Sequence, residues 1–235
     1  SYGGITPENV EGLVHGAMFT RGGKELQNTA IFIGGSDVTA GEKLLKKVTK
    51  TFFGPVRVSV MMDSNGSNTT AAAAVLSARK HLELKDCIAL VLAGTGPVGQ
   101  RAAQILASEG AHVRVASRAK DKAEKTCEAI RAATKSEHLT SYATSTREEL
   151  REACRHAQLI IAAGAAGVEL LPADVRKSLS SLKVAIDLNA VPPAGIAGIE
   201  VMDKAADRDG VICYGAIGVG GRKMKIHKAA IKSLF

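Results

Sequence analysis

Short apolar runs rich in β-branched residues alternate along the chain with longer segments in which apolar residues recur every three or four positions. The short runs predict buried strands at residues 29–35, 56–62, 157–164 and 183–189. The longer segments predict helices at residues 5–18, 39–53 and 68–82, the first with Thr6 as its N-cap. Such an alternation is typical of parallel sheets joined by crossover helices, so we expect an α/β fold.

A polar link at residues 83–86 separates two such groups of elements. We expect two α/β domains with parallel sheets, the first formed by residues 1–83 and the second by residues 84–221. A glycine-rich segment at 214–221 precedes a last, basic helix that is predicted to begin near Arg222. This returning segment, residues 222–235, is predicted to pack on the first domain.

The second domain opens with a glycine motif that lies between a predicted strand at residues 88–93 and a predicted helix at residues 98–110. The motif consists of Gly94, Thr95, Gly96, Pro97, Val98 and Gly99. In such a setting the first glycine forms the turn, the second lets the backbone approach a pyrophosphate, and the third lets the helix pack on the strand. The helix N-terminus also attracts the anion. We therefore predict a Rossmann-type dinucleotide-binding domain.

The next predicted strand ends in Ser117 and Arg118, where domains that bind NAD usually carry an acidic residue. A guanidinium group can bind a phosphate through two hydrogen bonds and can stack on adenine. With Lys122 close by in the sequence, the pattern favours NADP as the cofactor and predicts weaker binding of NAD. In the alternative interpretation, Arg118, Lys120 and Lys122 belong to the solvated start of a helix.

Two later strand ends are expected in the same crevice, because ligands of open α/β sheets bind at the carboxyl ends of the strands. Ala163 and Gly164 follow one strand and offer little bulk where a nucleotide backbone would pass. Asn189 follows the other strand, just before a Pro-Pro turn. We predict that these three residues contact the cofactor; the alternative is that both segments are plain turns.

Composition narrows the class of protein. Hydrophobic residues make up 46% and charged residues 23%, which is ordinary for a globular protein, and neither a membrane-spanning run nor a secretory segment is evident. A cytoplasmic location without membrane contact is therefore expected. The net charge is +8, but aromatic residues make up only 3% and the basic residues are spread along helices, so a small anionic ligand is favoured over nucleic acid. The four cysteines and six histidines are scattered, which argues against a metal site.

One junction between a strand and a helix is unusually polar. After Asp63, six of the next seven residues are Ser, Asn or Thr, and four alanines follow. Capping the alanine helix needs only one or two such side chains, for which Ser67 and Asn68 are the candidates. The remaining polar side chains suggest a wall that faces a ligand rich in hydrogen-bond donors and acceptors.

Six segments together resemble the methylene-tetrahydromethanopterin dehydrogenases, which are NADP-dependent enzymes of formaldehyde oxidation, some of which also accept methylenetetrahydrofolate. The segments are TRGGKE, FFGP, DSNGSNTTAAA, LAGTGPVG, DLNAVPPAGIAGI and GAIGVGGRKMKIHKA. The resemblance covers essentially the whole chain. It implies a pterin-binding first domain, a central NADP domain, a reaction in the cleft between them, a homo-oligomer (trimer or dimer), and further residues before Ser1 and after Phe235.

The resemblance also implies which residues contact the pterin. Lys223 matches a family lysine and is expected on the turn that enters the last helix, and Asp63 is expected to offset positive charge or to pair with the pterin ring. These two are the catalytic candidates. The predicted substrate contacts are Asp63, Ser64, Asn65, Gly66, Ser67, Asn68, Arg21 and Lys24. The alternatives are a solvated basic helix for Lys223, a capping role for Asp63 and a surface loop for Arg21 and Lys24.

Two histidines within helical patterns, His15 and His227, are interpreted as structural or surface residues. The Tyr-x-x-x-Lys pair of the related folate dehydrogenase-cyclohydrolases is absent, so we expect a dehydrogenase that does not hydrolyse the methenyl product. Two other functions stay open: a different Rossmann oxidoreductase of the shikimate or amino-acid dehydrogenase kind, or a non-catalytic module that senses NADP.

Overall fold

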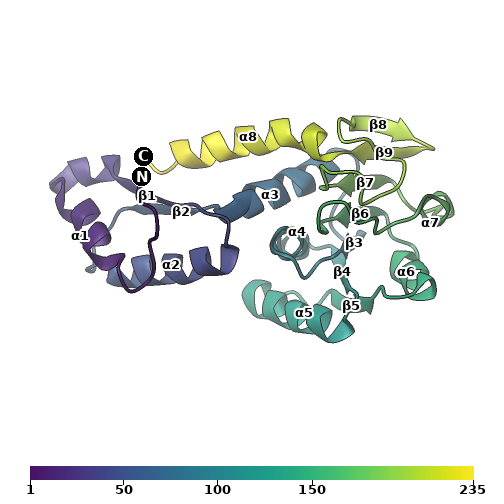
Figure 1. The fold of residues 1–235 in the computed structure, drawn as a ribbon, viewed down its shortest axis with the longest axis horizontal. Coiled ribbons are helices and arrows are strands. Elements are labelled where there is room, and N and C mark those ends of the chain that lie inside the picture. Colours follow the sequence, from purple (N-terminus) through teal and green to yellow (C-terminus); the bar gives the residue numbers. More distant parts are fainter. The chain divides into compact units, whose positions relative to one another are not determined.

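A computed structural model describes all 235 residues, which form two compact units (Figure 1). Unit 1 comprises Ser1–Thr69 and Met224–Phe235, and unit 2 comprises Thr70–Lys223. The boundaries fall inside two helices, α3 (Ser67–Ala78) and α8 (Ala216–Lys232). Residues 70–83 therefore lie in unit 2, whereas the sequence pattern had grouped them with the first domain.

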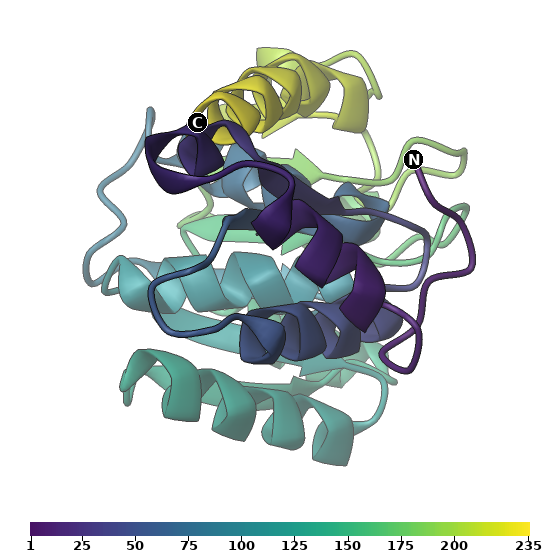
Figure 2. The same cartoon turned by 90° about the vertical axis from the view of Figure 1, so that its left-hand side faces the viewer.

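Unit 1 has a small parallel sheet. Its elements are α1 (Glu11–Phe19), the 3-10 helix η1 (Gly23–Asn28), β1 (Ala30–Ile33), α2 (Val38–Thr51), β2 (Ser59–Met62) and the 3-10 helix η2 (Ser64–Gly66). Strands β1 and β2 pair in parallel with Ala30 opposite Ser59. Figure 2 shows α1 and α2 side by side, and their apolar faces meet the sheet in a core that includes Val14, Met18 and Val48.

The first helix differs from the prediction. It begins at Glu11 rather than at Pro7, and residues 7–9 form a turn. Val10, and not Thr6, is the N-cap of this helix, and the backbone N–H of Thr6 donates to the side-chain oxygen of Asn9, 2.7 Å away. The Asn9 side chain therefore stabilises a local turn in place of the first helical turn.

Unit 2 has a seven-stranded sheet in the order β5-β4-β3-β6-β7-β9-β8 (Figure 1). Its strands are β3 (Ile88–Leu92), β4 (His112–Ser117), β5 (Leu139–Ala143), β6 (Leu159–Ala162), β7 (Val184–Asp187), β8 (Lys204–Arg208) and β9 (Val211–Tyr214). All neighbours pair in parallel except β8 and β9, which form an antiparallel hairpin. The six parallel strands follow the doubly wound order of dinucleotide-binding domains, which confirms the predicted α/β class.

The helices of unit 2 cover both faces of this sheet (Figure 1). They are α4 (Pro97–Ser108), α5 (Lys120–Thr134), α6 (Arg147–Cys154) and α7 (Ala173–Lys177). Helix α6 begins with a capping box, in which Thr146 and Glu149 each accept a backbone N–H of the other. Strands β3, β6 and β7 are buried on both faces and form the centre of the sheet, and the core around them includes Leu90, Ile160 and Ala185. No helix of the protein combines the length and the apolar character needed to cross a membrane.

Helix α8 begins at Ala216, six residues before the predicted start at Arg222. The glycines at its start favour a loop in the sequence pattern, because each glycine disfavours a helix by about 1 kcal/mol. A Cβ atom on Gly218 would overlap the carbonyl oxygen of Asp203, and one on Gly215 would overlap that of Glu200. These two glycines let the start of the helix pack directly on the backbone that leads into β8. Lys223 therefore lies inside the helix and not on a turn before it.

Candidate functional site

The glycine motif of unit 2 forms a tight turn from β3 into α4. The backbone N–H of Gly94 donates to the carbonyl oxygen of Ala116 at 2.8 Å, and that of Gly96 donates to Ala93 at 3.1 Å. Gln100 adds a side-chain hydrogen bond to the Thr95 carbonyl at 2.7 Å. These bonds hold the turn against the carboxyl end of β4.

The three glycines of the motif differ in what a side chain would meet. A Cβ atom on Gly94 would lie 2.9 Å from the carbonyl oxygen of Val91, and one on Gly99 would lie 2.8 Å from that of Ala93. A Cβ atom on Gly96 would come no closer than 3.6 Å to any atom beyond its chain neighbours. Packing inside the protein therefore explains the first and third glycines, but it leaves the second unexplained.

The first turn of α4 has the features of an anion site. Gly96 is its N-cap in an extended conformation, no side chain caps it, and Pro97 occupies the first position. The first N–H groups of the helix thus have no protein partner, and the helix dipole favours a negative charge there. Together with a glycine at position 96 that internal packing does not require, these features fit the pyrophosphate of a dinucleotide.

Ser117 and Arg118 lie at the carboxyl end of β4, next to this turn. Their backbone is fixed, because Ser117 accepts from the N–H of Thr144 at 3.0 Å and Arg118 accepts from the Ser145 hydroxyl at 2.5 Å. The Arg118 side chain is exposed and has no partner, and Lys122 is exposed in the first turn of α5. The structure thus presents a free guanidinium group where a ribose phosphate could meet it.

Ala163 and Gly164, at the end of β6, lie beside the glycine turn. The N–H of Ala163 donates to Leu92 at 3.1 Å, and the carbonyl oxygen of Ala163 lies 3.7 Å from where a Cβ atom of Gly96 would be. The predicted cofactor contacts at Ala163 and Gly164 are therefore next to the pyrophosphate position.

Asn189 is used mainly within its own loop. Its amide nitrogen donates to the carbonyl oxygen of Pro193 at 3.0 Å, and its amide oxygen accepts from the N–H of Val191 at 3.0 Å. One donor hydrogen and one acceptor lone pair remain on this amide. A cofactor contact by Asn189 stays a prediction, limited to those two positions.

Asp187, which the sequence reasoning did not single out, organises the same loop. Its side chain is buried and accepts from the backbone N–H groups of Asn189 at 2.9 Å and Ile196 at 3.0 Å. Burial raises the pKa of this carboxyl group above its usual range. The sequence feature that could have identified Asp187 is its place as the one acidic residue at the end of an otherwise apolar strand.

In unit 1, Asp63 is buried within a hydrogen-bond network, with only 1% of its side chain exposed. Oδ1 accepts the backbone N–H groups of Asn68 and Thr69, each at 3.1 Å, and Oδ2 accepts the Thr69 hydroxyl at 2.7 Å. The carboxylate therefore satisfies the N-terminus of α3, which was the alternative interpretation of this residue. A direct contact of Asp63 with a pterin ring would require its side chain to leave this network.

The polar residues after Asp63 divide into two groups. Ser64 and Ser67 are fully buried, and their hydroxyls donate to Gly34 at 3.3 Å and to Ser64 at 3.0 Å. Asn65 is exposed in the left-handed conformation at φ 53°, while Gly66 and Asn68 are half-buried. The buried polar side chains thus stabilise the turn itself. Of the substrate contacts predicted in this segment, Asn65, Gly66 and Asn68 have accessible surface.

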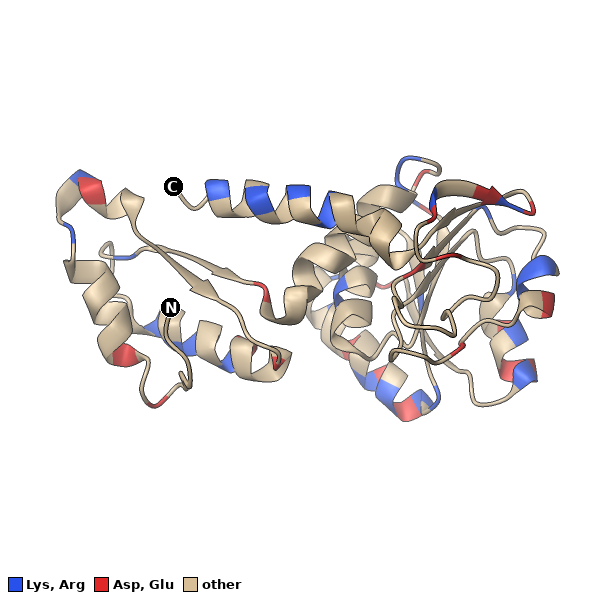
Figure 3. Cartoon of the chain, turned by 45° about the horizontal axis from the view of Figure 1, so that its top comes forward, with Lys and Arg blue, Asp and Glu red and all other residues tan.

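The three basic candidates differ in exposure and in whether their side chains already have partners within the protein. Arg21 donates to the Asn28 carbonyl at 2.7 Å and to the Thr29 hydroxyl at 3.1 Å, so it fastens the ends of η1. Lys24 is exposed on η1. Lys223 is half-buried inside α8 and has no ion-pair partner. Figure 3 shows only basic residues among the charged positions of α8.

The structure brings His227 into the Asp63 network, although the sequence reasoning had interpreted this histidine as a structural or surface residue. Nδ1 of His227 lies 3.3 Å from Oδ2 of Asp63, and 24% of the His227 side chain is exposed. The half-exposed ring of Phe32 meets the imidazole edge-on, with 5.8 Å between centroids. The sequence spacing could have singled out His227, because it lies four residues after the candidate Lys223 and therefore on the same face of the helix.

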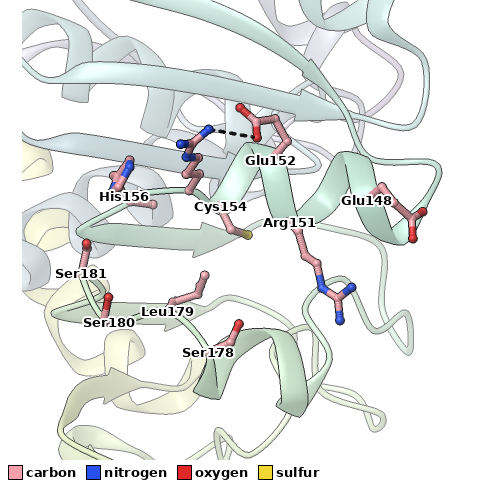
Figure 4. A pocket seen from close by; sticks show the side chains of 11 residues that line it. Glu148, Arg151, Glu152, Cys154, His156, Ser178, Leu179, Ser180 and Ser181 are labelled. Atoms are coloured by element: carbon pink, nitrogen blue, oxygen red, sulfur yellow. Dashed lines mark ion pairs between the residues drawn. The ribbon is translucent and has the colours of Figure 1, made fainter.

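A surface hollow of about 570 Å³ in unit 2 lies away from the glycine turn (Figure 4). It is lined by the end of α6 and by residues that precede β6 and β7, among them Arg155, His156 and Ser181. These are the amino ends of the parallel strands, whereas the glycine turn follows the carboxyl end of β3. The hollow is therefore not the dinucleotide site.

Comparison with known proteins supports both halves of this description. Residues 1–65 match the family described as "Methylene-tetrahydromethanopterin dehydrogenase, N-terminal", and residues 88–190 match "NADP oxidoreductase coenzyme F420-dependent". The solved structure of shikimate 5-dehydrogenase from Listeria monocytogenes is similar in fold, with a TM-score of 0.51 and 15% identity, covering 94% of this chain and 86% of that one.

Two proteins of Methylorubrum extorquens are similar over nearly the whole chain. The bifunctional protein MdtA is 47% identical over 236 residues, which cover 100% of this chain and 82% of the relative. An NAD(P)-dependent methylenetetrahydromethanopterin dehydrogenase is 33% identical over 231 residues, which cover 94% of this chain and 77% of the relative. With a Rossmann sheet and a glycine turn that fits a dinucleotide, the chain belongs to the methylene-tetrahydromethanopterin dehydrogenase family of oxidoreductases.

Proposed function

We propose that this protein transfers a hydride from the methylene group of methylene-tetrahydromethanopterin to NADP and so forms the methenyl pterin. The observation that carries the proposal is a glycine at position 96 that internal packing does not require, beside an uncapped helix N-terminus, in a chain of this family. Methylenetetrahydrofolate is a second candidate substrate, because it contains the same methylene bridge between two nitrogens.

The reaction makes modest demands on the protein. The nitrogen lone pairs of the substrate expel the hydride and delocalise the positive charge that remains, so no proton has to move. When bound, NADP supplies the nicotinamide carbon that accepts the hydride. The tasks left for this chain are to hold the reactants in register and to tolerate the methenyl cation. The buried negative charge of Asp63 suits the second task, and Lys223 suits a contact with an oxygen or the anionic tail of the pterin.

The preference for NADP rests on Arg118. Its unpaired guanidinium group follows β4, where an acid would repel a 2′-phosphate. We expect Arg118→Ala to raise the KM for NADP at least about tenfold, the equivalent of ~1.4 kcal/mol, and to change the KM for NAD little. Steady-state kinetics with both cofactors measures this; equal losses for the two would contradict a phosphate contact. Lys125→Ala, at an exposed lysine of α5 outside the predicted cofactor contacts, is the matched control for a general loss of positive charge.

We also propose that the enzyme does not hydrolyse its methenyl product. The residues four positions after Tyr2, Tyr142 and Tyr214 are Thr6, Thr146 and Gly218, so none of the tyrosines has the lysine of the cyclohydrolase pair. Rapid loss of methenyl pterin on addition of the purified protein, above the spontaneous rate, would refute this part of the proposal.

The absorbance of NADPH tests the proposed function directly. The purified protein is mixed with NADP and with methylene-tetrahydromethanopterin, methylenetetrahydrofolate or shikimate in separate assays. Reduction of NADP with either pterin supports the proposal. Reduction with shikimate alone would favour another class of dehydrogenase, and binding of NADP without any reduction would favour a sensing module.

A further inference from the structure

The Asp63 network in unit 1 ends in a ring nitrogen that nothing in the protein uses. Both carboxylate oxygens of Asp63 are occupied by Asn68, Thr69 and His227. Nε2 of His227 has no hydrogen-bond partner, and no buried polar side-chain atom of the protein lacks one. It follows that Nε2 is accessible to a ligand, whereas Asp63 is not.

The network also fixes which nitrogen of the ring carries the proton. Asp63 is surrounded by donors, and its carboxylate can only accept, so Nδ1 of a neutral His227 must carry the hydrogen that points to Oδ2. Nε2 then presents a lone pair to the outside and can only accept a hydrogen bond. In metal sites too, a carboxylate often binds one nitrogen of a histidine and so orients the ring for contact through the other nitrogen.

We infer that Nε2 of His227 positions the pterin by accepting a hydrogen bond from an N–H group of its pyrimidine ring. This inference rests on the proposed function. An acceptor suits the reaction, because a neutral imidazole adds no positive charge beside the developing methenyl cation. The exposed ring of Phe32, which meets the imidazole edge-on, adds an apolar surface of the kind that packs against a flat ligand ring. His227 is thus a binding residue, and Asp63 acts through it as a positioning residue.

Two substitutions distinguish the roles of the two ring nitrogens of His227. In His227→Asn the side-chain amide can occupy the place of Nδ1 and keep the contact with Asp63, but the distal acceptor is lost. In His227→Gln the longer amide can bring its oxygen near the place of Nε2, while the contact with Asp63 is weakened. We expect His227→Asn to raise the dissociation constant and the KM for the pterin about tenfold, as for one hydrogen bond to a buried partner, and to leave the KM for NADP and the melting temperature unchanged. His227→Gln is expected to recover part of the pterin affinity.

Direct binding keeps the inference apart from the proposed function. Titration calorimetry with tetrahydromethanopterin and tetrahydrofolate measures affinity whether or not NADP is reduced. Binding without oxidation by the wild type would overturn the proposed function alone, and the two variants would still test His227. Failure of the wild type to bind either pterin would overturn both. Unchanged pterin affinity in His227→Asn, or equal losses in pterin affinity, NADP affinity and melting temperature, would overturn the inference.

A spectroscopic measurement tests the tautomer independently of any ligand. Nitrogen-15 NMR of labelled histidine distinguishes a protonated from an unprotonated ring nitrogen, and His227→Asn identifies the resonance that belongs to His227. We expect protonated Nδ1 and unprotonated Nε2 in the neutral ring. The opposite assignment would overturn the role of Nε2 as an acceptor.

Discussion

Among the three glycines of the motif, Gly96 is the one whose identity the protein's own packing does not explain. Its neighbours in the motif, Gly94 and Gly99, touch backbone atoms of the turn, whereas the nearest atom to a Cβ on Gly96 is 3.6 Å away. A glycine that folding does not require points to a close approach from outside the chain. The pyrophosphate of a dinucleotide is the ligand that the surrounding turn and helix end suit best.

Alanine at this position should therefore separate binding from folding. We expect Gly96→Ala to weaken NADP binding at least about tenfold while the free energy of unfolding changes by less than about 1 kcal/mol. The matched variant Gly99→Ala places a Cβ against the Ala93 carbonyl and should destabilise the protein by about 1–3 kcal/mol. Cofactor titration and thermal unfolding measure the two effects; a Gly96→Ala protein that binds NADP normally would remove the support for the pyrophosphate position.

For the polar junction after Asp63, residue identity alone predicted the roles of the side chains less well than it did for the glycine motif. The pattern after Asp63 correctly marked a special turn, but it could not tell side chains that build the turn from side chains that face a ligand. Ser64 is fully buried against α2, and its hydroxyl occupies the space that a Cβ on Gly41 would take, so the helix packs closely on the turn there. Such tertiary contacts are not visible in local sequence, and neither was the contact of Asp63 with His227, 164 residues away.

At the scale of elements, the strand–turn–helix around the glycine motif was predictable because its signals are local. Periodicity, glycine spacing and the proline at the first helical position all agree there. The hairpin of β8 and β9 was not predicted. Residues 204–208 include two basic and one acidic residue and are largely exposed, so this edge strand lacks the apolar run that identified the buried ones.

Helix α8 shows how one contact can reverse a local preference. Its early glycines disfavour a helix, yet Gly218 is needed because its backbone lies against Asp203. We expect Gly218→Ala to destabilise the protein by about 3 kcal/mol, since the new Cβ overlaps a carbonyl oxygen. Gly221 is exposed in the same helix, and nothing lies within 4 Å of where its Cβ would be.

The matched variant Gly221→Ala should therefore stabilise the protein by about 0.5–1 kcal/mol, because alanine gains the helix propensity that glycine lacks. Urea denaturation of both variants measures the changes. Similar effects of the two substitutions would mean that close packing at Gly218 does not explain the early start of α8.

At the scale of the whole molecule, the chain is divided so that all four cysteines lie in unit 2, while both termini belong to unit 1 (Figures 1 and 2). Each cysteine is buried, and burial raises the pKa of Cys87 and Cys213 to about 11 and that of Cys154 to about 12. Because the thiolate is the reactive form, these thiols should stay inert in the folded protein from neutral pH to about pH 9. Thiol reactivity thus reports the opening of unit 2 alone.

This separation predicts what removal of the last segment does. A chain that ends at Lys223 loses Met224–Phe235, and with this segment His227, one of the three residues that hydrogen-bond to Asp63, so unit 1 should become less stable. Unit 2 keeps its seven strands and its core, so its thiols should remain protected. Reaction with a chromogenic disulfide at pH 8 measures this, with the full chain as the native control and urea-unfolded protein as the upper limit. Four thiols that react at the unfolded rate in the truncated chain would show that unit 2 cannot fold without the returning helix. Slow reaction, together with a loss of helical signal greater than the deleted part of α8 accounts for, would show that unit 2 folds without the C-terminal segment and that unit 1 depends on it.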